Sequence, residues 1–185
     1  LILIWGLSWI FYKSALMDNP PILFAGLRSL SGGIIMALFL LPSIKKLQWR
    51  KNARRYLISS VISVTMFYGI QCFGLVYLPG GLFSVLVYLQ PIILSLLAWM
   101  WFGEKMTVLK FAGLVVGFGG IAVISADSFT GEISLIGVLM GLATALVWAL
   151  STIYIKKESP HVDPLWMVAI PNIIGGAVLT CIGAA

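Results

Sequence analysis

The opening of this chain recurs, in the same order and without a gap, 143 residues further on. The pairs that keep this offset are Trp5 with Trp148, Leu7 with Leu150, Ser8 with Ser151, Lys13 with Lys156, Pro21 with Pro164, and Gly32-Gly33 with Gly175-Gly176. A single fixed offset indicates an internal repeat. The alternative is that two apolar helices share Trp, Gly and Pro through composition alone.

The residues between the two copies determine how the copies are oriented. Apolar residues make up 61% of the chain and charged residues 10%, against about 45–50% and about 25% in soluble domains, so lipid is the expected solvent. We count five membrane-spanning segments within one repeat. Because this number is odd, the second copy enters the bilayer from the opposite side, as in the inverted repeats of secondary transporters.

Seven apolar runs reach or approach the length of a bilayer helix, about 20 residues. They cover residues 1–17, 21–44, 56–78, 81–102, 109–126, 133–155 and 164–185. The sequence therefore predicts an all-α, multi-pass membrane protein, a polytopic helical bundle. Its first repeat covers residues 1–126 and the start of a second covers 133–185. Since both ends lie inside apolar runs, we expect a fragment that stops partway through the second repeat.

Basic residues indicate which side of the membrane each link occupies. The links after the second, fourth and sixth segments hold ten of the twelve Lys and Arg residues, and the alternate links hold only Lys13. Positively charged loops stay in the cytoplasm, so the first segment starts inside and the sixth starts outside. This count is independent of the repeat and also requires inversion. We therefore expect the net charge of +6 to set topology in the cell membrane, not to bind nucleic acid.

The sequence carries no recognisable enzyme motif. His161 is the sole histidine, and no metalloprotease, serine-hydrolase or phosphate-loop motif is present. Cys72 and Cys181 both lie in apolar runs, without metal-ligand spacing and without the context that favours a disulfide. We expect no catalytic residue, no metal and no cofactor.

Polar and aromatic residues form stripes along the predicted helices. The stripe residues are Trp5, Ser8, Trp9 and Tyr12 in the first segment, Tyr68 and Gln71 in the third, Tyr88 and Pro91 in the fourth, and Trp148 and Ser151 in the sixth. Inverted copies would bring such faces together near the middle of the membrane, where transporters bind substrate. The alternative is that the hydroxyl groups bond between helices and the aromatic rings only pack.

Arg28 lies about 10 Å along the second segment from its outer end. An arginine at that depth is costly, and it normally faces the protein interior or water. Arg28 either binds an anionic group such as a carboxylate, or extends back to the interface and tethers a neighbouring carbonyl. No Asp or Glu lies inside a predicted segment, so the sequence offers no carboxylate relay for proton coupling.

Three further features each allow more than one interpretation. Pro91 forms either a hinge or a static kink in the fourth segment. Glu104, at the cytoplasmic end of that segment, caps a helix, pairs with a basic residue or serves as a gate. Gly113 and Gly117 of the fifth segment, with Gly120 near the same face, either pack inside the bundle or form a homodimer face.

The stretch from Gly81 to Val123 resembles the EamA-type transporters of the drug/metabolite transporter superfamily. As in that family, Pro91 precedes a Gly103-Glu104-Lys105 motif and a glycine-rich helix follows it. The opening W-G-L-S-W and Arg28 are also similar to the family, and the resemblance extends over the whole chain. It implies a 5+5 inverted repeat with about seven of ten helices present here, and a central cavity lined by helices one to four and six to nine.

These patterns predict a secondary transporter that moves small polar metabolites, such as amino acids, across the cytoplasmic membrane by alternating access. Its expected partners are a small-molecule substrate and the lipid bilayer. One alternative is a multidrug efflux protein, which would need an acidic residue in the membrane to attract cations. The alternative from another class is a receptor or scaffold that transports nothing.

Overall fold

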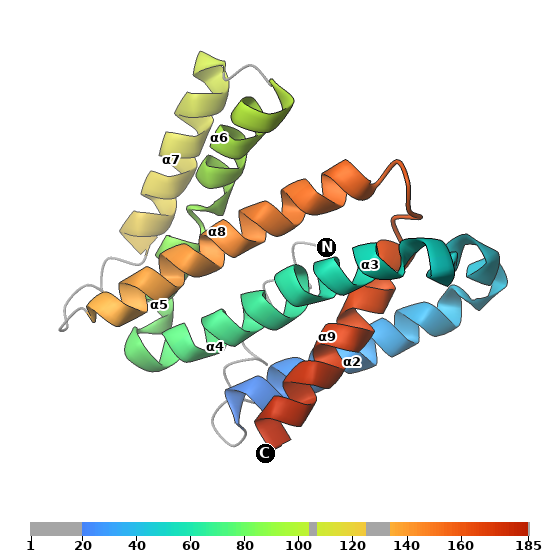
Figure 1. The fold of residues 1–185 in the computed structure, drawn as a ribbon. Helices are drawn as coiled ribbons and strands as arrows, with labels where there is room; N and C mark the ends of the chain where they lie inside the picture. The colour runs from blue at the N-terminus through green and yellow to red at the C-terminus, as the bar shows by residue number, and fades with distance from the viewer. Residues whose placement is uncertain (1–19, 104–106, 125–133, 185) are drawn as a thin grey trace.

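The computed structural model describes residues 20–103, 107–124 and 134–184, and these residues form helices with no strand among them (Figure 1). Among these described residues, five helices are long and apolar enough to cross a membrane. They are Pro21–Phe39, Trp49–Tyr77, Gly80–Phe102, Leu135–Glu158 and Trp166–Ala184. The predicted all-α, multi-pass membrane fold is confirmed. The predicted first segment, residues 1–17, lies outside the described residues.

The second and third predicted segments have different bounds from those expected. Helix α2 (Pro21–Phe39) ends five residues before the predicted end, and a 3-10 helix, η1 (Leu41–Leu47), follows it. Pro42 explains the change, because its ring has no N–H and clashes with the carbonyl four residues earlier. Helix α3 (Trp49–Ser59) begins seven residues before the predicted start. The basic link is therefore helical, since lysine and arginine are good helix formers.

The third span contains an unusual turn that the sequence analysis did not anticipate. Between α3 and α4 (Phe67–Tyr77), the segment Ser60–Met66 forms a π-helix, η2. Such wide turns are rare and often lie at functional sites. A β-carbon added to Gly175 would lie 2.6 Å from the Val64 β-carbon, so the wide turn packs closely against α9 (Trp166–Ala184).

The fourth span is interrupted where Pro91 predicts. Helix α5 (Gly80–Val87) ends before Tyr88, and α6 (Gln90–Phe102) begins immediately before the proline. The ring removes the amide hydrogen that would otherwise bond to the Val87 carbonyl. The amide of Leu89 instead donates to the Leu86 carbonyl at 3.2 Å, a tighter turn than in an α-helix.

Helices α2 and α9 lie side by side and run in opposite directions (Figure 1). Four glycines bring the two backbones together, and we call their contact the glycine seam; they are Gly26, Gly33, Gly176 and Gly183. A β-carbon added to Gly33 would lie 2.8 Å from the Ile173 backbone nitrogen, and one added to Gly176 would lie 2.8 Å from the Leu30 α-carbon. Small residues allow this close approach.

The repeat offset relates the contacts of the glycine seam to one another. Leu30 and Gly33 have Ile173 and Gly176 as their counterparts 143 residues later. The offset therefore exchanges the contact between Gly33 and Ile173 with the contact between Leu30 and Gly176. A twofold axis produces an interface whose contacts exchange in this way.

The contact at the other end of the seam corresponds, under the offset, to two residues of one buried cluster. Gly183 approaches Leu23, with an added β-carbon 2.6 Å from the Leu23 α-carbon. Under the offset, this pair corresponds to Leu40 and Trp166, which lie in one buried cluster. The relation between the two helices thus extends along the seam in both directions.

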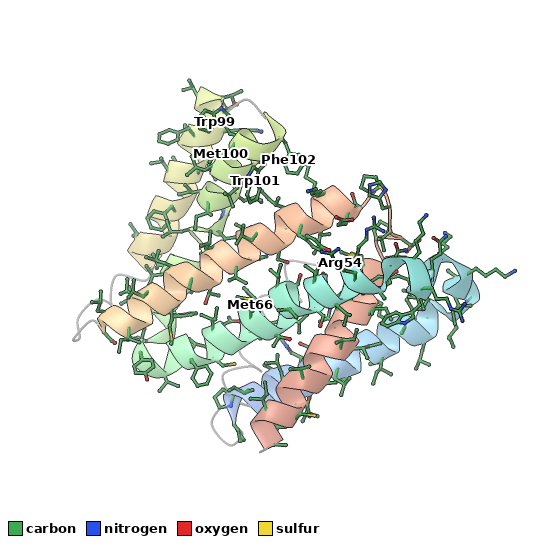
Figure 2. All side chains as sticks on the ribbon, in the orientation of Figure 1. Arg54, Met66, Trp99, Met100, Trp101 and Phe102 are labelled. Atoms are coloured by element: carbon green, nitrogen blue, oxygen red, sulfur yellow. The ribbon has the colours of Figure 1, made fainter. Side chains whose placement is uncertain are left out.

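Helix α7 (Val108–Ile124) follows α6, and the two form a hairpin at the edge of the structure (Figure 1). Nothing lies within 4 Å of a β-carbon added to Gly113, Gly117 or Gly120. Packing inside the bundle, one of the two interpretations of these glycines from the sequence, is therefore not observed in the described part of the chain. Figure 2 shows Trp99, Met100, Trp101 and Phe102 on the same hairpin, and all four are exposed, as lipid-facing side chains would be.

Candidate transport site

Arg28 contacts an aromatic ring of the third span. Its guanidinium carbon lies 4.9 Å from the centroid of the Tyr68 ring, within the range of a cation–π interaction. This contact joins α2 to α4, and neither interpretation of Arg28 from the sequence named it. The ring does not neutralise the charge of the guanidinium, and a guanidinium is a group whose shape and charge suit a carboxylate.

The aromatic contacts continue from Tyr68 to α8 (Leu135–Glu158). The rings of Tyr68 and Phe67 meet edge to face with centroids 5.0 Å apart, and Phe67 meets Trp148 in the same way at 5.5 Å. Trp148 also packs against a buried cluster that includes Leu82 and Phe83 of α5. We call Tyr68, Phe67 and Trp148 the aromatic chain. With Arg28 it connects helices from both sides of the expected repeat boundary.

Phe67 is the member of the aromatic chain that the sequence analysis missed. The predicted stripe of the third segment contained Tyr68 and Gln71 but not Phe67. A signal was present, because Phe67 precedes Gln71 by four residues and therefore lies on the same helical face. Gln90 was also missed; it is buried at the start of α6, directly after the break in the fourth span.

Ser151 lies in a short ladder of hydroxyl groups between the third span and α8. Its Oγ is 2.6 Å from that of Ser63, which in turn is 3.2 Å from that of Ser59. Ser151 is only 5% exposed. In this conformation Ser151 therefore makes an interhelical hydrogen bond, the alternative that the sequence analysis held against a role in the substrate pathway.

Replacing Ser151 by alanine tests how much this hydrogen bond contributes to the stability of the protein. We expect Ser151→Ala to lower the free energy of unfolding by about 0.6 kcal/mol, the average for hydrogen bonds between membrane helices. Thr152 provides the control, because its hydroxyl donates to the Trp148 carbonyl of its own helix at 3.0 Å, a bond within one helix and not between two. Thr152→Ala should therefore change the unfolding midpoint less than Ser151→Ala in a thermal denaturation assay. A larger loss for Thr152→Ala would contradict the interhelical role.

The remaining predicted site residues lie apart from the aromatic chain or outside the described residues. Gln71 and Tyr88 are half-buried, and Pro91 is exposed at the start of α6. Trp5, Ser8, Trp9, Tyr12 and Glu104 lie outside the described residues. The stripe of the first segment and the role of Glu104 therefore stay predictions.

Comparison with known proteins gives the family of the chain. The model of the EamA-like transporter family matches residues 1–126 and again 135–185. The uncharacterized transporter YvbV of Bacillus subtilis is 47% identical over 183 residues, which cover 99% of this chain and 60% of that protein. A second B. subtilis protein, the uncharacterized transporter YoaV, is 33% identical over 180 residues, covering 96% of this chain and 62% of that protein.

A more distant relative carries a more specific name. The probable amino-acid metabolite efflux pump of Escherichia coli is 28% identical over 182 residues, covering 93% of this chain and 58% of that protein. The chain thus spans about three fifths of the length of each of these three relatives. No solved structure matches it significantly. Since the family model matches nearly all of its residues, the chain belongs to the EamA-like transporter family.

Proposed function

We propose that this chain belongs to a secondary transporter of the cytoplasmic membrane that moves small polar metabolites by alternating access. The observation that carries the proposal is the glycine seam, whose contacts exchange under the 143-residue offset. Two halves related by an axis in the membrane plane can exchange conformations, and this exchange opens a central site to one side and then to the other.

Arg28 and the aromatic chain support amino acids and related metabolites as the proposed substrate class. A guanidinium binds a carboxylate through two parallel hydrogen bonds, and an aromatic wall accepts an apolar side chain. Amino acids and related metabolites carry both groups. The name of the E. coli relative, an amino-acid metabolite efflux pump, supports the same class.

Replacing Arg28 tests the proposed function directly. We expect Arg28→Gln to slow transport of carboxylate substrates about 10- to 100-fold, because a hydrogen bond to a charged group contributes about 1.5–3 kcal/mol. Neutral analogues should be transported at nearly the wild-type rate. The measurement is uptake into proteoliposomes from a panel of paired acids and amides.

A matched control distinguishes the loss of a positive charge at the site from the loss of a positive charge elsewhere in the protein. Arg54→Gln removes an exposed arginine of α3 (Figure 2) and should leave the uptake of both substrate classes unchanged. If Arg28→Gln instead reduces uptake of acids and amides equally, and less protein folds, then Arg28 has a structural role and the proposed substrate class is wrong.

Tyr68 provides a second, graded test of the same site. Tyr68→Phe keeps the ring under the guanidinium and should leave carboxylate transport close to wild type. Tyr68→Leu removes the ring, and we expect the apparent affinity for carboxylates to fall about 3- to 30-fold, in line with about 0.5–2 kcal/mol for a cation–π contact. Equal effects of the two substitutions would show that the ring does not position Arg28.

A further inference from the structure

An ion pair joins the third span to α8 at one end of the bundle. Arg55 Nε lies 2.5 Å from Glu158 Oε2, and the two side chains are 29% and 16% exposed. Arg55 Nη1 also donates to the Asn52 side-chain oxygen at 2.8 Å. The Tyr154 hydroxyl donates to the Arg55 carbonyl at 3.5 Å. Arg55 is therefore held from its own helix and from α8, and we call its pair with Glu158 the basic-end latch.

A second set of contacts crosses between the same two parts of the chain at the same end. Lys46 Nζ lies 3.7 Å from Asp163 Oδ2, and the Trp166 indole donates to the Ser43 carbonyl at 3.2 Å. Asp163 Oδ1 also accepts from the Leu165 backbone amide at 3.1 Å, at the start of α9. In Figure 1, η1, the start of α3, the end of α8 and the start of α9 meet at this end. Residues 43–55 and 154–166 therefore close this end of the bundle together.

The basic-end latch lies well away from the candidate transport site along both helices. Arg55 precedes Phe67 by 12 residues, about 18 Å of helix, and Trp148 precedes Glu158 by 10 residues, about 15 Å. The hydroxyl ladder of Ser59, Ser63 and Ser151 lies between these two levels. Along both helices the latch therefore lies nearer the basic end of the bundle than the hydroxyl ladder and the aromatic chain do.

The chemistry of the pair suits a contact that breaks and re-forms. Both side chains are partly exposed, so water can hydrate each charge when the pair separates. A pair of fully buried charges would leave an uncompensated charge on opening, at a much higher cost. A hydrophobic contact would expose apolar surface to water when it opened. The latch therefore holds the closed state with a contact that is inexpensive to release.

We infer that the pair of Arg55 and Glu158 is the inner gate of the transporter, and that its separation opens the path from the cytoplasm to the site beside Arg28. This inference rests on the proposed function. It assigns the described conformation to a state that is closed at its basic end. It also gives α8 two roles, since Trp148 faces the site and Glu158 closes the way to it.

The test measures access to a residue below the latch, and it does not depend on transport. Cys72 and Cys181 are first replaced by alanine, and Ser63→Cys then serves as the single reporter thiol. In inside-out vesicles of the full chain, a membrane-impermeant maleimide is added from the cytoplasmic side. We expect Arg55→Gln and Glu158→Gln each to speed labelling about two- to fivefold, because either change removes the attraction between two partly exposed charges that favours the closed state.

Two further variants distinguish a gate from a general loss of packing. Arg54→Gln removes the neighbouring charge of the same helix and should leave the labelling rate unchanged. The double substitution Arg55→Glu with Glu158→Arg restores an ion pair and should bring the rate back towards wild type. Unchanged labelling in both single variants, or equally fast labelling in the exchanged pair, would overturn the inference. Failure of the proposed function would look different, with no substrate transported by the wild-type protein.

Discussion

Gly176→Leu is expected to prevent stable packing of the bundle, whereas Gly32→Leu is expected to leave it intact. At Gly176, an added β-carbon would lie 2.8 Å from the Leu30 α-carbon, so the clash is with backbone, which cannot move aside as a side chain can. Forcing atoms into a packed contact typically costs about 1–3 kcal/mol, and a leucine between two backbones lies at or above the top of that range. The measurement is the unfolding midpoint of the purified protein in detergent.

The control for this experiment lies one residue from the seam. A β-carbon added to Gly32 meets nothing within 4 Å, although Gly32 adjoins Gly33 in the same helix and has the same apolar surroundings in sequence. Gly33→Leu, the repeat counterpart of Gly176→Leu, should destabilise the protein as strongly as that variant. Similar unfolding midpoints for Gly32→Leu and Gly176→Leu would show that α2 and α9 are not in contact through these glycines.

Trp166→Ala is expected to produce the second large loss of stability. Trp166 is 2% exposed and lies in a buried cluster with Leu40, Tyr56 and Met167. Removing a buried tryptophan side chain typically costs about 3–5 kcal/mol. Trp166→Phe keeps most of the packing and loses the hydrogen bond to the Ser43 carbonyl, for an expected cost of about 0.5–1.5 kcal/mol.

The same assay checks this prediction against an exposed residue of the same type. Trp101 is 57% exposed at the end of α6, so Trp101→Ala should change the unfolding midpoint little (Figure 2). The expected order of stability is wild type, Trp101→Ala, Trp166→Phe and then Trp166→Ala. If Trp101→Ala proved as destabilising as Trp166→Ala, the assignment of the core at this end of the bundle would be wrong.

Hydropathy predicted the existence of the spans because lipid imposes one length and one polarity on every crossing helix. The break before Pro91 was also predictable, since it follows from the chemistry of a single residue. The π-helix Ser60–Met66 was not predictable, because hydropathy does not distinguish a π-helix from an α-helix. The early end of α2 was missed because the apolar run continues past Pro42, and hydropathy does not register the missing amide.

The candidate site was only partly visible in the sequence for a similar reason. Periodicity placed Tyr68 on a helical face, and depth in the membrane singled out Arg28. That the two residues meet depends on how α2 lies against α4, which the pattern of either helix alone does not contain. The same limit applies to Ser151, whose bond to Ser63 depends on the register between two helices that are distant in sequence.

The proposed alternating access depends on the inverted relation of α2 and α9, and this relation can be tested by finding the side of the membrane on which each helix begins. Pro20 immediately precedes α2 and Pro164 lies two residues before α9, and both prolines are exposed. In protein without Cys72 and Cys181, Pro20→Cys and Pro164→Cys are labelled separately with an impermeant maleimide added to either side of the membrane. Inverted halves predict labelling of Pro164→Cys from the cytoplasmic side and of Pro20→Cys from the opposite side. Labelling of both from the same side would show that the two halves are not inverted.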